Sequence, residues 1–233
     1  MAPVARELSK KRGLLEPLQT RDSVDGQIEE LELQLGKYAV FPVTLVGSSW
    51  GAVLALLTAA QKHIEIYKLI LIGSAVFDAE SSARIEGIRT SRLNEKQRRR
   101  LDEIKSRYDD SEGKGRIAEI WGELSFYTDT YDPITDDLEV IEIQYELSGK
   151  VWTEFTELRD RSGYLKSEFS KIEIPTVVIH GEYDPHPIDG IRPFLESCID
   201  NIRFHILPHC GHYPWIERRA GERFYETLEE ELS

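Results

Sequence analysis

Residues 43–57 read Val-Thr-Leu-Val-Gly-Ser-Ser-Trp-Gly-Ala-Val-Leu-Ala-Leu-Leu, and the structural period changes within this stretch at a serine flanked by glycines. Val43 to Val46 is a short apolar run, which is typical of a strand buried on both faces. Ala52 to Ala60 consists of strong helix formers that are apolar almost all round, which predicts a buried helix. A strand therefore turns directly into a helix at residues 47–51.

This turn, Gly47-Ser48-Ser49-Trp50-Gly51, has the pattern G-x-S-x-G, which can present a nucleophilic serine. A direct strand-to-helix turn strains the backbone of Ser49, and we expect crowding to leave room only for glycine at Gly47 and Gly51. The hydroxyl would stand beside a helix N-terminus, where free N–H groups favour a developing negative charge. The alternative is that small residues merely let the helix pack close to the strand, and a single short motif does not decide between them.

Size and composition predict one globular domain with room for an inserted sub-domain: the chain has 233 residues, of which 40% are hydrophobic and 30% charged. No apolar run has the length of a membrane span or follows the amino terminus as a leader, so a cytoplasmic protein without a membrane partner is expected. Cys198 and Cys210 give no disulfide framework. A net charge of −13 argues against a nucleic-acid partner.

Outside the turn, apolar runs alternate with helical patterns. Because the expected strands are continuous apolar runs, a parallel sheet covered by helices on both faces is predicted, which is an α/β fold. Pro17 places the first expected strand at a sheet edge. The helices are expected at 2–11, 23–38, 188–198 and 217–232, and the further strands at 14–18, 67–74, 175–184 and 202–207.

Residues 78–171 break this alternation, because they are charged, helix-forming and without a buried strand pattern. We interpret them as a helical cap insertion, with helices at 93–108, 117–126 and 138–147, and the α/β core as residues 1–77 and 172–233. The acidic stretch from Asp129 to Glu139 lacks the glycine-turn spacing of an EF-hand loop, so a solvated acidic turn is expected there.

Two further polar residues follow expected strands. Asp184 comes directly after the strand at 176–180, and His212 comes after the strand at 202–207. A serine nucleophile needs a base, and the base needs an acid that orients it. Because the carboxyl ends of parallel strands share one edge of the sheet, Ser49, Asp184 and His212 are expected to lie at the same crevice.

Three motifs in this order resemble the α/β-hydrolase family: Gly47-Ser-Ser49-Trp-Gly51, Gly181-Glu-Tyr-Asp184 and Cys210-Gly-His212-Tyr-Pro-Trp. The resemblance implies that Ser49 is the nucleophile, His212 the general base and then acid, and Asp184 its orienting acid. It also implies that the Trp50 backbone N–H is an oxyanion donor. A Trp-containing turn followed by a helical cap is similar to the prolyl iminopeptidase-like and small-ester-hydrolase branches.

Neighbouring residues offer alternatives for the base and the acid. His209 and His186 flank the two loops, but Gly211-His212 matches the motif, so we expect His209 to be a loop residue and His186 a pocket-rim residue at best. Asp189 could replace Asp184 but is expected at a helix start, where a carboxylate has a structural reason to be.

The remaining candidates are interpreted as structural. Glu182 is expected in solvent, and Ser48 cannot be the nucleophile because the glycines would then be mis-spaced. Cys198 and Cys210 are expected to be small core or loop residues. No set of histidines, cysteines and carboxylates has metal-ligand spacing, so neither a metal nor a cofactor is expected.

The chain also departs from the family pattern. The family normally has strands before the point where this chain begins, one of which ends in a His-Gly-Gly type loop that gives a second oxyanion donor. The glycines before Ser49 are Gly13, Gly26, Gly36 and Gly47, and none forms such a loop. Losing one oxyanion donor typically costs about 10²–10³ in rate. An amino-terminally shortened reading frame with weak or no activity is therefore expected, and the DNA upstream of Met1 would test it.

Two functional hypotheses follow. The first is a serine hydrolase that cleaves a small-molecule ester or amide through an acyl-enzyme, with cap acids such as Glu123, Glu142 or Glu146 holding a substrate ammonium. The second is a non-catalytic or truncated α/β-hydrolase-like protein with little or no activity. An exposed sheet edge or gap also predicts self-association.

Overall fold

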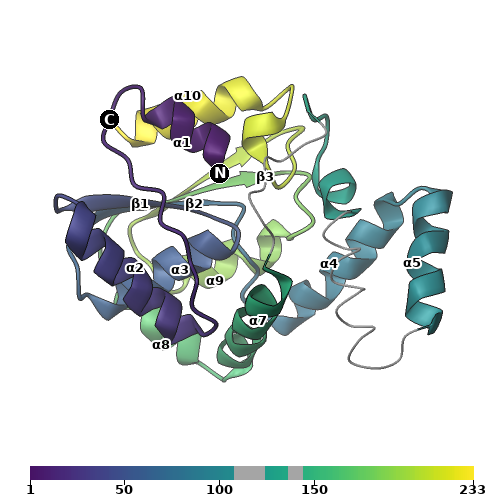
Figure 1. The fold of residues 1–233 in the computed structure, drawn as a ribbon, viewed down its shortest axis with the longest axis horizontal. Helices are drawn as coiled ribbons and strands as arrows, with labels where there is room; N and C mark the ends of the chain where they lie inside the picture. The colour runs from purple at the N-terminus through teal and green to yellow at the C-terminus, as the bar shows by residue number, and fades with distance from the viewer. Residues whose placement is uncertain (108–123, 136–143) are drawn as a thin grey trace.

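Four short apolar runs form a parallel sheet at the centre of the computed structural model, which describes residues 1–107, 124–135 and 144–233 (Figure 1). The strand order is β1-β2-β3-β4, so each strand lies beside its neighbour in sequence. Every connection must cross over the sheet, because all three pairings are parallel. The strands are β1 (Val43–Ser48), β2 (Ile66–Ile72), β3 (Thr176–Gly181) and β4 (Ile202–Leu207).

Helices cover both faces of this sheet, which confirms the predicted α/β class (Figure 1). On one face lie α2 (Val24–Tyr38), α3 (Trp50–Gln61), α8 (Tyr164–Phe169) and α9 (Arg192–Glu196). On the other lie α1 (Ala2–Leu8) and α10 (Gly221–Glu231). The remaining elements are α4 (Ala79–Arg92), α5 (Glu95–Arg107), α7 (Tyr145–Asp160), the short helices η1 (Ile188–Gly190) and η2 (Pro214–Ile216), and a helical segment at 124–129.

Side chains of the strands alternate between two hydrophobic clusters. Leu69 and Leu71 of β2 belong to the cluster under α2 and α3, whereas Ile70 and Ile72 belong to the cluster under α1 and α10. All four are completely buried. Because a strand directs successive side chains to opposite faces, a continuous apolar run is what a doubly covered sheet requires.

The second helix begins where the sequence predicts. Ser23 has extended backbone angles, and its hydroxyl accepts a hydrogen bond from the backbone N–H of Gly26 at 3.1 Å. This N-cap satisfies one of the helix's free donors. Ile28, Leu31 and Leu35 then form a buried stripe that packs toward α3.

The predicted edge strand at 14–18 is wrong. These residues form no strand, and Leu14, Leu15 and Leu18 are exposed. Pro17 has no backbone donor, and polar side chains of α2 hold the segment instead: Gln34 donates to the Leu18 carbonyl at 3.0 Å. The segment therefore lies against a helix rather than in the sheet.

Three predicted helices are shorter than expected, and the first ends at Leu8 rather than at residue 11. Residues 188–198 form η1 and α9 separately, with Pro193 at the start of α9. The last helix begins at Gly221 rather than at Glu217, because the Glu217 side chain accepts hydrogen bonds from the backbone N–H groups of Tyr131 and Gly211 at 2.7 and 2.8 Å. Glu217 thus ties two loops together before the helix starts.

The described part of the 78–171 insertion contains helices and no strand, and α5 agrees with the helix expected at 93–108. The helices expected at 117–126 and 138–147 lie largely outside the described residues. Leu165 and Phe169 of α8 share one hydrophobic cluster with the sheet, so this end of the insertion packs against the core. The division into core and cap stays a prediction. None of the described helices has the length and apolar character that crossing a bilayer requires.

Candidate active site

Ser49 lies on a sharp turn between β1 and α3. Its backbone angles are φ 54° and ψ −120°, in the positive-φ region that residues other than glycine rarely adopt. Strain of this kind costs about 1–3 kcal/mol and is concentrated at functional sites. The predicted strained turn at Ser49 is therefore confirmed.

The two glycines of the turn contribute differently. A Cβ added at Gly47 would lie 2.1 Å from the carbonyl oxygen of Gly51, so only glycine fits at position 47. A Cβ added at Gly51 would meet nothing within 4 Å. The expectation that crowding requires glycine at both positions is right for Gly47 and wrong for Gly51, because the crowding comes from the Gly51 backbone and acts on Gly47.

Trp50 is the first residue of α3, so its backbone N–H has no acceptor within the helix. Its side chain is anchored away from the turn: the indole N–H donates to Gln27 Oε1 at 2.7 Å, and the ring packs edge-on against Phe155. The side chain thus fixes the start of the helix beside Ser49. The Trp50 N–H remains available as a donor at the helix N-terminus.

Asp184 and His212 meet at the carboxyl edge of the sheet. His212 Nδ1 lies 2.7 Å from Asp184 Oδ2, and both side chains are buried. Burial by itself raises the pKa of Asp184, but the surrounding histidines outweigh it and hold that pKa well below its ordinary value. Burial by itself lowers the pKa of His212, but the Asp184 carboxylate outweighs it and raises that pKa. The pair therefore favours a charged carboxylate beside a basic imidazole.

Gly73 connects the Ser49 turn with this pair. The Ser49 N–H donates to the carbonyl of Ile72 at 2.9 Å, and the next residue, Gly73, has φ +52°. A Cβ added at Gly73 would lie 3.0 Å from His212 Nδ1 and 3.2 Å from Asp184 Oδ2. The end of β2 therefore adjoins all three predicted residues. In the part of the chain that the structure describes, no hydrogen bond joins Ser49 Oγ to His212.

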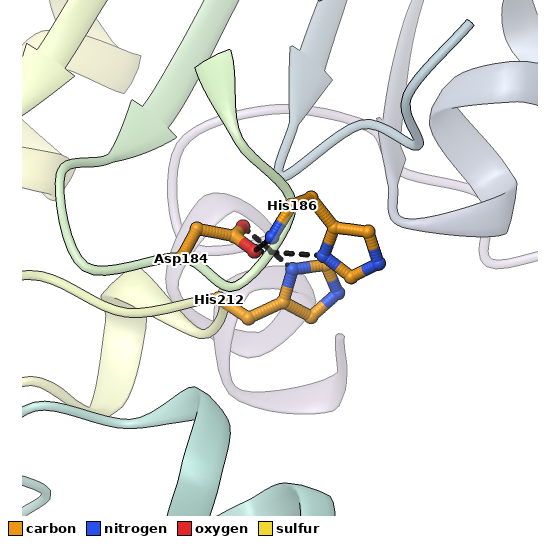
Figure 2. Close-up of side chains that lie close together, drawn as sticks. All are labelled: Asp184, His186 and His212. Carbon is orange, nitrogen blue, oxygen red and sulfur yellow. Dashed lines mark hydrogen bonds and ion pairs between the residues drawn. The ribbon is translucent and has the colours of Figure 1, made fainter. Parts of the chain in front are cut away.

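His186 is a second imidazole on the same carboxylate (Figure 2). Its Nδ1 lies 2.7 Å from Asp184 Oδ1, and its backbone N–H donates to that oxygen at 2.9 Å. The His186 and His212 rings lie 4.7 Å apart between centroids, and Figure 2 shows both Nε2 atoms pointing away from Asp184. His186 is only 8% exposed, so the prediction that it lies at a pocket rim is wrong. Its two hydrogen bonds to Asp184 hold it in a buried position.

A third histidine, His180 on β3, lies beside these two. Its Nε2 is 2.9 Å from the backbone carbonyl oxygen of His186, and because a carbonyl only accepts, this nitrogen carries the proton. Its Nδ1 lies 3.9 Å from Asp184 Oδ2 and has no hydrogen-bond partner among the described residues. Burial lowers the pKa of His180, which favours the neutral ring with an unshared lone pair.

Residues of the insertion hold the backbone of the His212 loop. The His212 N–H donates to the carbonyl of Asp129 at 2.6 Å, and a Cβ added at Gly211 would lie 2.0 Å from that oxygen. The Asp129 carboxylate is fully buried and accepts three hydrogen bonds from Arg89 of α4. The expectation of a solvated acidic turn is therefore wrong for Asp129, because Arg89 neutralises its carboxylate inside the protein.

Asp184, His186 and His212 also form a possible ligand set for a metal ion, since one ligand atom from each lies within 4.8 Å of the others. Sequence spacing gave no sign of this cluster, because His212 is separated from Asp184 by 28 positions. The only local signal is the Asp-Pro-His order at 184–186. Two imidazoles and a carboxylate are groups that bind zinc and related metals.

The other candidate residues have structural surroundings. His209 is a loop residue with φ 53°, and its ring packs against Tyr131, as expected for a loop position. Asp189 lies in η1 and forms an exposed ion pair with Arg84 at 2.7 Å. Glu182 is exposed to solvent, as expected.

The two cysteines are buried, and burial raises the pKa of both thiols, so neither is activated as a thiolate. Of the cap acids, Glu123 and Glu142 lie outside the described residues. Glu146 is exposed in the first turn of α7.

Comparison with known proteins gives the family. A family model described as alpha/beta hydrolase fold matches residues 23–218. The chain belongs to the alpha/beta hydrolase fold family. The matched region contains Ser49, Asp184 and His212, and it spans the 78–171 insertion.

Individual relatives include a curated hydrolase and a proline iminopeptidase. A curated relative, 2-hydroxy-6-oxo-6-(2'-aminophenyl)hexa-2,4-dienoic acid hydrolase of Metapseudomonas resinovorans, is 38% identical over 63 residues, which are 26% of this chain and only 21% of that protein. VinJ has a similar structure (TM-score 0.61, 19% identity, 91% of this chain, 74% of that one). So does a proline iminopeptidase from Mycobacterium smegmatis (TM-score 0.58, 17% identity, 90% and 71%). These structural likenesses concern the fold.

Proposed function

We propose that this protein is a serine hydrolase that cleaves an ester or a small amide through an acyl-enzyme. Ser49 is the nucleophile, His212 the general base and acid, Asp184 the group that orients His212, and the Trp50 N–H an oxyanion donor. The observation that carries the proposal is the strained Ser49 turn beside Gly73, where an added Cβ would lie 3.0 Å from His212 Nδ1 in the Asp184–His212 pair. Family membership supports the same reading.

The proposed reaction follows from the hydrogen-bond directions. Asp184 accepts from Nδ1–H of His212, which leaves the lone pair of His212 on Nε2. As Ser49 Oγ attacks the substrate carbonyl carbon, its proton passes to Nε2, and the new oxyanion accepts a hydrogen bond from the Trp50 N–H. His212 then gives this proton to the leaving oxygen or nitrogen, and water repeats the sequence on the acyl-enzyme. The Ser49–His212 hydrogen bond would form when substrate binds, as it often does in such enzymes.

A non-catalytic binding protein is the second candidate. The observation that favours it is the lack of a hydrogen bond between Ser49 Oγ and His212 within the described residues. Trp50 is also the single oxyanion donor that we assign, whereas such sites usually combine two. Under this hypothesis the residues around Ser49 and His212 would bind a ligand without chemically changing it.

Turnover of a substrate panel separates the two candidates. We would assay short-chain esters and aminoacyl amides. The wild type and Ser48→Ala should hydrolyse at least one of them, whereas Ser49→Ala should lose about 10⁴-fold or more in kcat. Ser48 is the matched control, since it precedes Ser49 in the same turn. Equal rates in Ser48→Ala and Ser49→Ala would overturn the proposal.

A further inference from the structure

Three imidazoles surround the carboxylate of Asp184, and the proposed reaction uses one of them. His212 and His186 each place Nδ1 at 2.7 Å from a different oxygen, and His180 places Nδ1 at 3.9 Å from Oδ2. The side chains of Asp184 and His180 are at most 1% exposed. A general base needs one orienting carboxylate and no further histidine. The positions of the His186 and His180 rings beside Asp184 are therefore not explained by the proposed reaction.

The His180 ring leaves one nitrogen without a partner beside the carboxylate. Its Nε2–H donates to the carbonyl oxygen of His186, so its Nδ1 carries a lone pair 3.9 Å from Asp184 Oδ2 and has no hydrogen-bond partner among the described residues. Two electron-rich groups facing each other inside a protein are unfavourable unless a cation lies near both. Histidines that bind metals usually donate their other ring N–H to a carbonyl or a carboxylate in this way.

The other three residues bring possible ligand atoms near one another. Ligand atoms of Asp184, His186 and His212 all lie within 4.8 Å of one another. Zinc binds imidazole nitrogen at about 2.0–2.1 Å and carboxylate oxygen at about 2.0–2.2 Å in a tetrahedral arrangement, so two of its ligand atoms lie about 3.4 Å apart. An ion in front of the carboxylate could therefore reach both Nδ1 atoms after small movements.

We propose that Asp184, His186 and His212 form a binding site for a divalent transition-metal ion such as Zn²⁺, with His180 beside it, and that a bound ion inhibits the chemistry of Ser49. The inhibitory part rests on the proposed function. The binding part stands on the cluster alone.

Inhibition follows from where the imidazole protons go. Without metal, Nδ1 of His212 and of His186 carries the proton that is donated to Asp184. A metal takes the Nδ1 lone pair, so the proton of each neutral ring moves to Nε2 through solvent, with no net gain or loss of protons. His212 then has no lone pair on Nε2 and cannot accept the proton of Ser49.

Zinc binding can be measured without reference to activity. Equilibrium dialysis with ZnCl₂ should give one Zn²⁺ per wild-type chain, and His186→Phe, which keeps a ring against His212, should weaken binding at least about tenfold. His63→Ala and His205→Ala are controls, because these histidines lie outside the cluster beside Glu32 and Glu231. Loss of the bound Zn²⁺ in either control, or unchanged binding in His186→Phe, would overturn the site.

A measurement on the wild type remains informative even if His186→Phe fails to fold. Nitrogen NMR of ¹⁵N-histidine-labelled protein should show His186 and His212 changing from the Nδ1–H to the Nε2–H form when ZnCl₂ is added. A fluorophosphonate probe should stop labelling Ser49 with Zn²⁺ and resume after EDTA. Unchanged histidine signals would overturn the site. Unchanged Ser49 labelling with zinc bound would overturn the inhibition, whereas an absence of labelling without zinc would count against the proposed function instead.

Discussion

A shielded carboxylate lies at each end of the sheet, and the two have different partners. At the carboxyl end, Asp184 is surrounded by three histidines. At the amino end, Glu231 of α10 accepts from Arg203 and His205 of β4 at 2.7 and 3.0 Å, and Lys68 of β2 lies 3.6 Å away.

The partners determine what each carboxylate can do. Lys68 and Arg203 keep their charge and offer no lone pair, and with His205 they hold Glu231 of α10 against the strands. Imidazoles change protonation near neutral pH and offer lone pairs, so the Asp184 cluster can move a proton or bind a metal. The comparison teaches that permanently charged partners, which Glu231 has and Asp184 lacks, distinguish the two clusters more than burial of the carboxylate does.

The largest expected effect is on turnover in Asp184→Asn. Without the carboxylate, His212 loses the group that fixes its tautomer and stabilises its charged form, so kcat should fall about 10⁴-fold. Glu231→Gln is the matched control and should keep its kcat, because Glu231 lies at the other end of the strands. Steady-state kinetics on whichever ester or amide proves to be a substrate would measure both. Similar losses in the two variants would mean that the clusters do not differ in function.

Asp129 is a third buried carboxylate, and Arg89 of the insertion is its charge partner. Removing Arg89 tests whether this ion pair stabilises the protein. Arg89→Met leaves the Asp129 carboxylate buried without its cation, which should lower the free energy of unfolding by about 3–5 kcal/mol. Arg84→Met is the matched control on the same helix, since its pair with Asp189 is exposed to solvent and should leave the free energy of unfolding nearly unchanged. Urea denaturation gives both values. Equal effects would show that Arg89 does not neutralise a buried charge.

Gly73→Ala should disturb the Asp184 cluster directly. The new Cβ would lie 3.0 Å from His212 Nδ1 at a residue with φ +52°, so His212 and Asp184 must shift. A shift of a fraction of an ångström should lower kcat about 10- to 100-fold. Gly36→Ala in α2 meets nothing within 4 Å and should leave kcat unchanged while raising stability slightly. An unaffected rate in Gly73→Ala would place the reacting groups elsewhere.

The smallest expected effect is the dependence of stability on Glu231. Burial raises the pKa of this carboxyl, but His205, Arg203 and Lys68 outweigh it and lower that pKa below its ordinary value of 4.5. A lowered pKa in the folded state means that the stabilisation is present above pH 4.5 and is lost as the pH falls through the folded value. At pH 7, Glu231→Gln should therefore be less stable than the wild type by about 1–2 kcal/mol and should unfold at a lower Tm. The difference in Tm should become smaller as the pH falls. A difference that grows below pH 4.5 would contradict this sign.

Local sequence signals predicted the parts of the site that depend on local structure. The Ser49 turn could be predicted because an apolar run, two glycines and a helical run follow one another without a loop. Asp184 and His212 could be placed because each follows a strand, and the carboxyl ends of parallel strands share an edge. In each case neighbouring residues were enough to predict the position.

The missed features depend on contacts between distant segments. Arg89 and Asp129 are 40 positions apart, and Glu231 is 163 positions from Lys68, so spacing along the chain could not predict either cluster. Position 47 requires glycine because the backbone of Gly51 lies against it. The G-x-S-x-G motif alone does not show which of its two glycines is crowded. The contact of His186 with Asp184 could have been predicted from the sequence, since His186 lies only two positions after Asp184 on the same loop.

Labelling with a fluorophosphonate probe tests the central claim, an activated Ser49, most directly. Intact mass and peptide mapping of the wild type should show one modification, at Ser49, and Ser49→Ala and His212→Ala should both remain unmodified. Folded wild-type protein that stays unlabelled, or a label that persists in Ser49→Ala, would contradict the assignment of Ser49 as an activated nucleophile.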